Sequence, residues 1–360
     1  MIRVLEIISH LERSSGVAQV VLNWYGHIDR TQLQFDFLFF EAEDTALRRE
    51  LENAGARCYR LPHPYKAPLK FLRECRHFFK THRYRIVHSH ITHLNLFFYP
   101  LAKMFGAKYI IQHAHGTRWS DKKLSGLRNY LMLHAVWPLI THKIACSRKA
   151  GKVFFANKCN LINNGIDTEK FTFDVQVRDN KRKELGLENA FVIGHVGRFS
   201  AEKNHAFLLD IFAAVAAKDP AARLVLVGEG PLSAPIKALA AAKKLQDNVL
   251  FLGLRTDVAQ LYQAFDVLVL PSFHEGMPVV GVEAQAAGLP GVFADTITPE
   301  VLLLPSSCTL PLGESAEVWA EHILALKGEV RQSGTSYLRQ KGFDIWQTAK
   351  EIQNFYRGLN

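Results

Sequence analysis

The sequence predicts an α/β protein built from two doubly wound, Rossmann-like domains. Short apolar strands alternate with helical stretches, which favours parallel strands joined by right-handed crossovers. The alternation runs through each half of the chain, and a polar, charged stretch at 167–190 lies between the halves. The length of 360 residues also suits two domains better than one.

In the first half, each apolar run has the length of a strand, and helical spacing follows it. The expected strands are 2–9, 35–40, 86–90 and 109–115. The expected helices are 16–28, 44–53 and a basic stretch at 66–85. We assign residues 1–170 to this domain and expect the helix at 345–360 to pack back on it.

The second half, residues 171–344, repeats the pattern. Its expected strands are 191–197, 223–228, 249–253 and 267–271. Its expected helices are 206–217, 232–244, a short helix after 253, and 279–287. In such sheets ligands bind beyond the carboxyl ends of the strands, and the informative loops of this chain all fall there.

Composition excludes several classes of protein. With 48% hydrophobic and 22% charged residues, the chain is an ordinary globular one. Its first apolar run is too short for a membrane span or a signal peptide, so we expect a soluble, cytoplasmic protein. An odd number of cysteines without a CxxC motif argues against a disulfide framework and a zinc site. The five cysteines are Cys58, Cys75, Cys146, Cys159 and Cys308.

The excess positive charge lies in one half. Residues 1–172 hold 26 Lys and Arg against 13 Asp and Glu, whereas the remainder holds 18 against 21. Such asymmetry indicates an anionic partner, either nucleic acid or an acidic membrane surface. No nucleic-acid module is recognisable, so we expect no nucleic-acid partner.

The most informative pattern is a pair of acids, Glu275 and Glu283. Glu275 falls on a loop at the carboxyl end of a strand, and Glu283 lies about one turn inside the next helix. Backbone N–H groups at that helix start, from Gly276 to Val280, have no intrahelical acceptor and favour an anion such as a diphosphate. One carboxylate then suits sugar hydroxyls and the other suits ribose hydroxyls.

Three further loops of the second half carry candidate ligand contacts. Arg198 and Lys203, in GRFSAEKN, can reach one phosphate, although a solvated charged loop is the alternative. The GEGPL turn at 228–232 is either a plain turn or a ligand contact. At the end of the strand 249–253, the backbone of Gly253 and Leu254 can face a base, whereas Arg255 fits a helix start capped by Thr256 better.

Histidines gather in the first half, at 88, 90, 93, 113 and 115. Spacing of two along a strand points side chains the same way, so a metal site is conceivable, but no carboxylate or cysteine joins them at a familiar spacing and we expect no metal. We favour His115 as a substrate contact over a satisfied strand-end histidine. Gly16, in the loop of RSSGVAQVV, can approach a diphosphate, although the full GxGxxG pattern is absent.

The basic stretch 66–85 mixes apolar and cationic residues at helical spacing. The apolar ones are Leu69, Leu72, Phe78 and Phe79, and the cationic ones include Lys70, Arg73, Arg76, Lys80 and Arg83. This composition favours contact with a membrane surface. The alternative is a helix that packs its apolar face on the sheet, and both can hold together.

These residues together resemble the family 4 glycosyltransferases of the GT-B fold, in particular those that build bacterial capsular polysaccharides and exopolysaccharides. The matching segments, in chain order, are SSGVAQVVLN, HSH, HAHGT, NNGID, GRFSAEKN, GEGPL, FLG, HEGMPVVGVE, GLP and DTITPE. The two acids at this spacing, preceded by GRFSAEKN, form the most specific part. The resemblance implies two Rossmann-like domains that face a cleft.

The resemblance also implies roles for the candidate residues. Arg198 and Lys203 would neutralise the donor diphosphate, and Gly197 and Gly16 would approach the donor. Glu275 would bind the donor sugar, Glu283 the ribose, and His115 the sugar from the first domain. Gly253 and Leu254 would bind the donor with them, and the sugar and phosphate pocket would be lined by Gly276, Met277, Pro278 and Val279.

The implied activity is retaining transfer of a hexosyl or N-acetylhexosaminyl group from a nucleotide-diphosphate sugar, a UDP-sugar, to a lipid-linked saccharide. No cofactor or metal would be needed, and the protein would be peripheral at the inner face of the membrane. Same-face attack and a covalent intermediate both remain open, as does the oligomeric state. The alternatives are a nucleotide-sugar epimerase of the same fold, a non-catalytic nucleotide-sugar-binding subunit, and a protein that binds anionic polymers.

Two positions depart from the family pattern. Ser15 and Gly16 stand where related proteins often have two adjacent glycines, which puts the diphosphate contact of Gly16 in doubt. Gly291 stands where a β-branched residue is usual, which should loosen that strand.

Overall fold

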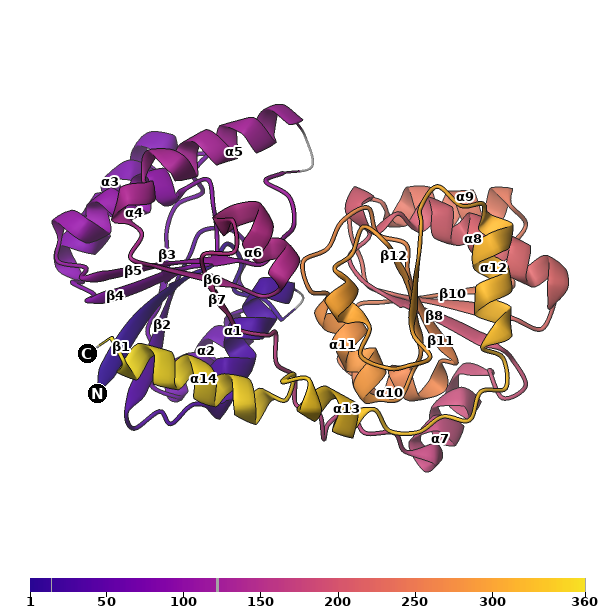
Figure 1. Cartoon of the computed structure of the whole chain (residues 1–360). Coiled ribbons are helices and arrows are strands. Elements are labelled where there is room, and N and C mark those ends of the chain that lie inside the picture. Colours follow the sequence, from indigo (N-terminus) through magenta and orange to yellow (C-terminus); the bar gives the residue numbers. More distant parts are fainter. Residues whose placement is uncertain (14, 121–122, 360) are drawn as a thin grey trace. The chain divides into compact units, whose positions relative to one another are not determined.

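The computed structural model describes residues 1–13, 15–120 and 123–359, and these residues form two compact units (Figure 1). The first unit comprises Met1–Gly165 and the segment from Ile345 onward, and the second is Ile166–Asp344. Residues 166–170, which the sequence assigns to the first domain, lie in the second unit. The reason is local pairing: the Ile166 amide donates to the Phe343 carbonyl (3.0 Å), and the Thr168 hydroxyl donates to Asp344 (2.5 Å).

The first unit is built on a seven-stranded parallel sheet of order β3-β2-β1-β4-β5-β6-β7. Helices cover both faces of the sheet, so the strands read as apolar runs; every residue of β2 is buried. The strands are β1 (Ile2–Ile7), β2 (Leu33–Phe39), β3 (Cys58–Arg60), β4 (Ile86–Ser89), β5 (Tyr109–Ala114), β6 (His142–Ala145) and β7 (Asn160–Leu161).

Helices α3, α4 and α5 lie on one face of this sheet, and α1 lies with α14 on the other (Figure 1). Thus the helix near the C-terminus belongs to the unit that begins the chain. The bounds are α1 (Gly16–His27), α2 (Thr45–Asn53), α3 (Pro68–Thr81), α4 (Asn95–Met104), α5 (Lys123–Ala135), η1 (Trp137–Leu139), α6 (Arg148–Phe155) and α14 (Ile345–Arg357). None of the helices in the described part of the chain is both long and apolar enough to cross a bilayer.

The second unit has a six-stranded parallel sheet of order β10-β9-β8-β11-β12-β13. Its strands are β8 (Val192–Val196), β9 (Arg223–Val227), β10 (Val249–Gly253), β11 (Val267–Leu270), β12 (Gly291–Ala294) and β13 (Cys308–Leu310). Both sheets therefore have the strand order of a dinucleotide-binding fold, which reverses direction next to the first strand. The reversal falls between β1 and β4 in the first unit and between β8 and β11 in the second.

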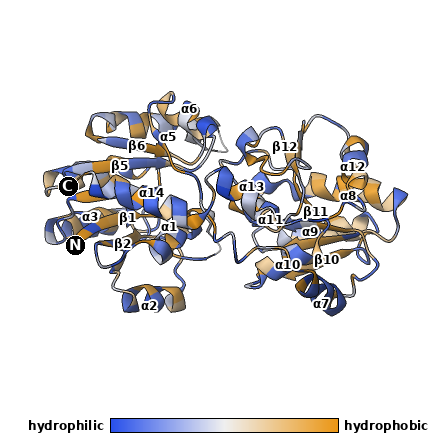
Figure 2. Ribbon diagram, turned by 60° about the horizontal axis from the view of Figure 1, so that its bottom comes forward, coloured by the Kyte–Doolittle hydropathy of each residue, from blue (hydrophilic) through white to orange (hydrophobic). Residues whose placement is uncertain are grey.

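Helices flank both faces of the second sheet as well. Figure 2 shows the contrast between α7, which is hydrophilic along its length, and the largely hydrophobic α8. The polar stretch that the sequence places between the halves contains α7, a surface helix on which Lys181 alone is buried. The bounds are α7 (Val175–Leu185), η2 (Ala201–Lys203), α8 (His205–Lys218), α9 (Ser233–Ala242), α10 (Val258–Ala264), α11 (Val279–Ala286), η3 (Pro299–Val301), α12 (Ala316–Ala325) and α13 (Thr335–Gln340).

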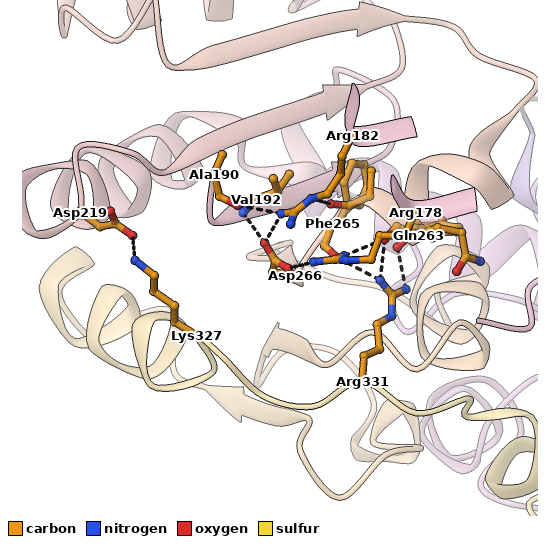
Figure 3. Close-up of polar contacts among 12 residues, drawn as sticks. Arg178, Arg182, Ala190, Val192, Asp219, Gln263, Phe265, Asp266, Lys327 and Arg331 are labelled. Atoms are coloured by element: carbon orange, nitrogen blue, oxygen red, sulfur yellow. Dashed lines mark hydrogen bonds and ion pairs between the residues drawn. The ribbon is translucent and has the colours of Figure 1, made fainter. Parts of the chain in front are cut away.

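An arginine fixes the ends of the two helices that matter for the site. Arg331 donates to the carbonyls of Tyr262, Gln263 and Phe265 at the end of α10, and to that of Ala287 at the end of α11, over 2.7–3.0 Å (Figure 3). These carbonyls have no intrahelical donor, so a guanidinium there satisfies them and complements both helix dipoles.

A second cluster in Figure 3 holds the start of β11. Asp266 accepts from Arg178 (2.5 Å), from Arg182 (2.7 Å) and from the amide of Val192 (2.7 Å), which ties α7 and β8 to β11. Because its carboxylate is bonded from three sides, the two strands that flank the sheet reversal are locked at their amino ends. The carboxyl ends of these two strands, where ligands of such sheets bind, lie at the opposite edge of the sheet from this cluster.

Replacing Arg331 by alanine should lower the free energy of unfolding by about 3 kcal/mol, since the covered carbonyls of Tyr262 and Ala287 lose their donor, whereas those of Gln263 and Phe265 keep Arg178. Thermal or urea unfolding measures the change. Arg339→Ala is the matched control, because the ion pair of Arg339 with Glu169 is about half exposed and should contribute less than about 1 kcal/mol. Equal effects of the two substitutions would contradict the proposed clamp.

Candidate active site

The site of the second unit is organised around an ion pair between Lys203 and Glu275. Lys203 ends η2 after β8, and Glu275 follows β11, so the pair stands at the reversal of the sheet. The side chains are 15% and 17% exposed, which leaves them partly accessible to a ligand. Asn204, in the left-handed conformation at φ 55°, closes η2 and starts α8, and thereby fixes the direction of Lys203.

The start of α11 is open, as the sequence predicts. Its N-cap is Pro278, which offers no capping side chain, and the amides of Val279 and Val280 find no acceptor among the described residues. Gly276, Met277 and Pro278 are buried, so they present backbone more than side chain. A helix start with unsatisfied N–H groups beside a lysine is suited to a phosphate.

Arg198 lies on the same loop as Lys203 and is exposed. Among the described residues, its guanidinium has no hydrogen-bond or ion-pair partner. The loop is held by the GEGPL turn, because a Cβ at Gly228 would lie 2.1 Å from the carbonyl oxygen of Gly197, and one at Gly230 would lie 2.4 Å from that of Phe199. These glycines therefore permit close packing of two loops.

Glu283 meets a buried tyrosine that the sequence did not indicate. The Tyr262 hydroxyl, on α10, donates to the Glu283 carboxylate over 3.1 Å. Burial raises the pKa of Glu283 to about 7, and the hydrogen bond from Tyr262 opposes that rise only in part. A carboxylate with this pKa gains most from a ligand that donates hydrogen bonds to it.

A cavity of about 180 Å³ opens between the ends of β8, β9 and β10. Its lining combines two aromatic rings with glycine backbone. The lining residues are Phe199, Gly228, Glu229, Gly230, Ser233, Lys237, Phe251 and Gly253. Gly253 belongs to it, whereas Leu254 is 62% exposed beside it. Arg255 is engaged by Asp257 (2.7 Å), so its side chain belongs to the start of α10; the N-cap there is Asp257, and Thr256 is not the cap that the sequence predicts.

In the first unit, His115 follows β5 and joins a group of buried side chains. Its Nε2 lies 2.8 Å from Nδ1 of His90, whose Nε2 lies 2.8 Å from Glu6. Burial, together with the neighbouring histidines, lowers the pKa of His115 well below its usual value. Ligand atoms of His88, His90 and His113 lie within 4.8 Å of one another, yet both nitrogens of His90 are already engaged. That the protein needs no metal stays a prediction.

Gly16 is the first residue of α1, after the N-cap Ser15, and a Cβ there would meet no atom within 4 Å. The backbone is thus open to a ligand on this side. Ser14, which belongs to the SSGVAQVVLN segment, lies outside the described residues.

A wide groove of about 1170 Å³ lies in the first unit at the carboxyl ends of β2 and β3 and along α3. One wall is charge-compensated, since Arg60 pairs with Glu43 (3.2 Å) and His10 with Glu41 (2.7 Å). Three further polar side chains of the lining are exposed and have no partner among the described residues. They are the side chains of Lys66, Lys70 and His77.

Sequence reasoning missed Glu6, Tyr262 and the aromatic lining at Phe199 and Phe251. A charge at position 6 inside the apolar run IRVLEII was a usable signal, because an isolated carboxylate in a buried strand needs partners. The other three read as ordinary core residues, and only the packing of distant loops brings them to the site.

Two sheets of dinucleotide-binding order, with a lysine–carboxylate pair and an open helix start at one reversal, define a nucleotide-dependent transferase of the GT-B class. The comparisons agree. Residues 15–151 match the model of a glycosyl transferase 4-like domain, and residues 190–327 match that of glycosyl transferases group 1. EpsF of Bacillus subtilis (strain 168), assigned as a glycosyltransferase, is 34% identical over 98% of this chain and 96% of its own length. The chain belongs to the family 4 glycosyltransferases of the GT-B fold, and it is a glycosyltransferase.

Two other relatives are informative. An Escherichia coli enzyme, UDP-Gal:alpha-D-GlcNAc-diphosphoundecaprenol alpha-1,3-galactosyltransferase, is 30% identical over 60% of this chain and 59% of its own length. The crystal structure of Anabaena Alr3699/HepE in complex with UDP-glucose has a similar fold, with a TM-score of 0.81 over 99% of this chain and all of that one, at 20% identity.

Proposed function

We propose that the protein is a retaining glycosyltransferase that moves a sugar from a UDP-sugar to a lipid-linked saccharide during synthesis of a capsular polysaccharide or exopolysaccharide. The observation that carries the proposal is the Lys203–Glu275 pair beside the open start of α11. A cation and unsatisfied N–H groups receive a diphosphate, and the adjacent carboxylate receives hydroxyls of the sugar attached to it.

In this proposal the diphosphate is the leaving group, and charge grows on it as the glycosidic bond breaks. Lys203, Arg198 and the amides of Val279 and Val280 are placed to stabilise that charge, so no cofactor or metal is required. Glu275 orients the sugar, Glu283 holds the ribose, and His115 contacts a substrate hydroxyl. Among the described residues nothing pairs with the Arg198 guanidinium, which supports its part.

The cavity near Phe199 and Phe251 is proposed to take the nucleobase. Its size and its aromatic walls suit a flat ring, and glycine backbone lets the ring come close. UDP is the nucleotide named with the Anabaena structures and in the Escherichia coli relative, which supports uracil as the base.

The groove of the first unit is proposed to take the acceptor. An acceptor linked to lipid through a diphosphate carries the negative charge that Lys66, Lys70 and His77 can bind. The Escherichia coli relative acts, by its name, on a sugar attached to diphosphoundecaprenol, which supports this class of acceptor.

A membrane-facing surface is proposed on α3, α4 and α5, because α4 contacts both neighbours and apolar side chains stand out from this layer. Leu69 is 82% exposed on α3 and Leu124 is 85% exposed on α5. Further exposed apolar residues of the layer are Leu72, Met104, Leu127, Tyr130 and Leu131, and Tyr65 is exposed just before α3. Phe78 and Phe79 of α3 are buried, so this helix packs on the sheet with one face and leaves its leucines and cations outside.

Affinity for a UDP-sugar should fall below about pH 7, because ribose hydroxyls bind the ionised form of Glu283, whose pKa in the free protein is about 7. Binding lowers that pKa, so a proton is released, and affinity should weaken by about tenfold per pH unit on the acid side and level off above pH 7. Calorimetry in buffers of different ionisation enthalpy measures both effects. A UDP-sugar is the ligand to use, since its diphosphate diester has no pKa near 7. Glu283→Gln should bind more weakly, with no pH dependence in this window; a dependence retained in that variant would contradict the assignment.

The proposed function is tested by a screen of UDP-sugars by thermal shift, followed by mass spectrometry of a lipid-diphosphate saccharide incubated with the stabilising donor. An increase of one sugar in the mass of the acceptor, with retained configuration by NMR, is the expected result. Isomerisation of the donor without acceptor would identify an epimerase instead. Binding without turnover on any acceptor would identify a non-catalytic subunit.

A further inference from the structure

The buried group beneath His115 forms a chain of hydrogen bonds with a definite direction. Glu6 lies on β1 and is fully buried, and its register partner on β4 is His88. From Glu6 the chain runs to Nε2 of His90 (2.8 Å) and from Nδ1 of His90 to Nε2 of His115 (2.8 Å). It thus begins at a carboxylate in the core and ends at a partly exposed ring.

The carboxylate end sets the direction. Burial alone would raise the pKa of Glu6, but its interactions with His88 and His90 lower it to about 2. Glu6 is therefore ionised and can only accept. The Tyr356 hydroxyl donates to its other oxygen over 2.9 Å, and Nδ1 of His88 lies 3.3 Å from the first. Both oxygens of the Glu6 carboxylate therefore face donor groups.

The protons of the two histidines then follow. Burial lowers the pKa of His90 to about 4, so its ring is neutral and carries one proton, which must be on Nε2 facing Glu6. Its Nδ1 is consequently an acceptor, and Nε2 of His115 must donate to it. Because His115 is also neutral, its own Nδ1 carries no proton. Among the described residues no group donates to that nitrogen, and it is not sealed from solvent.

The surrounding rings hold this arrangement in place. His113 stacks on His115 with centroids 4.1 Å apart, and Trp24 stacks on His113 at 5.7 Å. The imidazole planes cannot turn over without moving these neighbours. Exchange of the two nitrogens of His115 is therefore hindered by packing as well as by hydrogen bonding.

We propose that Glu6 and His90 are positioning residues, which hold His115 neutral with Nδ1 as a hydrogen-bond acceptor for a hydroxyl of the sugar substrate. A ring in this state binds a hydroxyl or an N–H and rejects a carboxylate or phosphate, so the relay contributes to the choice of a neutral sugar group at this point. The proposal deepens the proposed function and depends on it for the identity of the ligand, but the relay itself is a property of the substrate-free protein.

The first experiment uses the wild-type protein with ¹⁵N-labelled histidine and records long-range ¹H–¹⁵N spectra, with His115→Gln to assign the resonance. We expect His115 to show a protonated Nε2 and an unprotonated Nδ1 near neutral pH. A proton on Nδ1, or a doubly protonated ring, would overturn the proposal. Because no substrate is present, this result is independent of whether the protein transfers sugar.

The second experiment reverses the relay with Glu6→Gln. The carboxamide has one acceptor, its oxygen, and with the Tyr356 hydroxyl donating to that oxygen, as it does to Oε1 of Glu6, the amide nitrogen faces His90. The nitrogen donates to Nε2 of His90, so His90 carries its proton on Nδ1 and donates to His115, whose proton then moves to Nδ1. We expect this change of tautomer together with a fall in kcat/KM of about tenfold or more. The Nδ1–H of His115 would then face the sugar hydroxyl, and both groups would be donors. Glu321→Gln is the control and should change neither reading, because Glu321 makes only an exposed ion pair with Lys218 in the second unit.

The outcomes separate the two proposals. If the tautomers are as expected in both proteins but no sugar is transferred, the relay stands and the function fails. If transfer is found but Glu6→Gln leaves the tautomer of His115 unchanged, the relay fails. A series of deoxy UDP-sugars separates this role from a purely structural one. The effect of Glu6→Gln on kcat/KM should vanish for the sugar that lacks the hydroxyl bound by His115, whereas a structural defect would lower kcat/KM for every sugar.

Discussion

Replacing Lys203 by alanine is expected to lower kcat for sugar transfer by about 10³-fold while the protein stays folded. Lys203 is the half-buried cation beside the open start of α11, where the leaving diphosphate would gain negative charge. Its loss removes that stabilisation. It also leaves Glu275 without this cation, so the carboxylate would repel the diphosphate. Steady-state release of UDP, with circular dichroism to verify folding, measures the effect.

Lys218→Ala is the matched control for this prediction. Lys218 makes an ion pair with Glu321 over 2.8 Å, but both side chains are largely exposed, so its removal should leave kcat unchanged. Activity of Lys203→Ala within about threefold of the wild type would contradict the assignment of the site.

Removal of Glu275 tests whether the pair acts as one unit. Glu275→Ala alone should also lower kcat by about 10³-fold, since the sugar loses its contact next to the reacting carbon. The double variant should be little worse than either single one, because groups that act together are not additive. Effects that multiply would instead indicate two independent roles.

The fold could be read from the sequence because each strand of a doubly wound sheet is a local apolar run. The helix predicted at 206–217 is α8, His205–Lys218, and that at 279–287 is α11, Val279–Ala286. Elements without a local apolar signal were not predicted. The two-residue strand β7 is exposed at both positions, and α7 has a nearly uniform polar sequence. Such elements are defined by neighbours that the sequence does not reveal.

The candidate site was predictable as far as it depends on local geometry. Lys203 and Glu275 each follow a strand, and the carboxyl ends of neighbouring parallel strands meet at one edge, so their contact follows from the topology. The partner of Glu283 was not predictable, because Tyr262 reaches it from another helix whose end is set by Arg331. The relay below His115 depends on Tyr356, which is distant in the chain from the histidines it supports.

Reversing four cations, three on α3 and one two residues beyond its end, should weaken binding to acidic vesicles by at least about 10³-fold, since each cation near such a surface contributes about 1 kcal/mol. The substitutions are Arg73→Glu, Arg76→Glu, Lys80→Glu and Arg83→Glu, all at exposed positions outside the proposed acceptor groove. Co-sedimentation with vesicles that contain anionic lipid measures the loss. Transfer to a water-soluble acceptor analogue should be retained, because these residues do not touch the candidate active site.

Four reversals elsewhere separate a local surface from net charge. Lys152→Glu, Lys158→Glu, Lys183→Glu and Lys350→Glu change the total charge equally at exposed positions outside α3, α4 and α5. If this control binds vesicles like the wild type, attraction comes from the layer itself; if both variants lose binding equally, the surface is not specific.

Leu124→Ser with Leu127→Ser tests insertion of α5. Burial of apolar side chains persists when salt screens the charges. The two leucine substitutions should therefore weaken vesicle binding most at high ionic strength, where the cations of α3 contribute least.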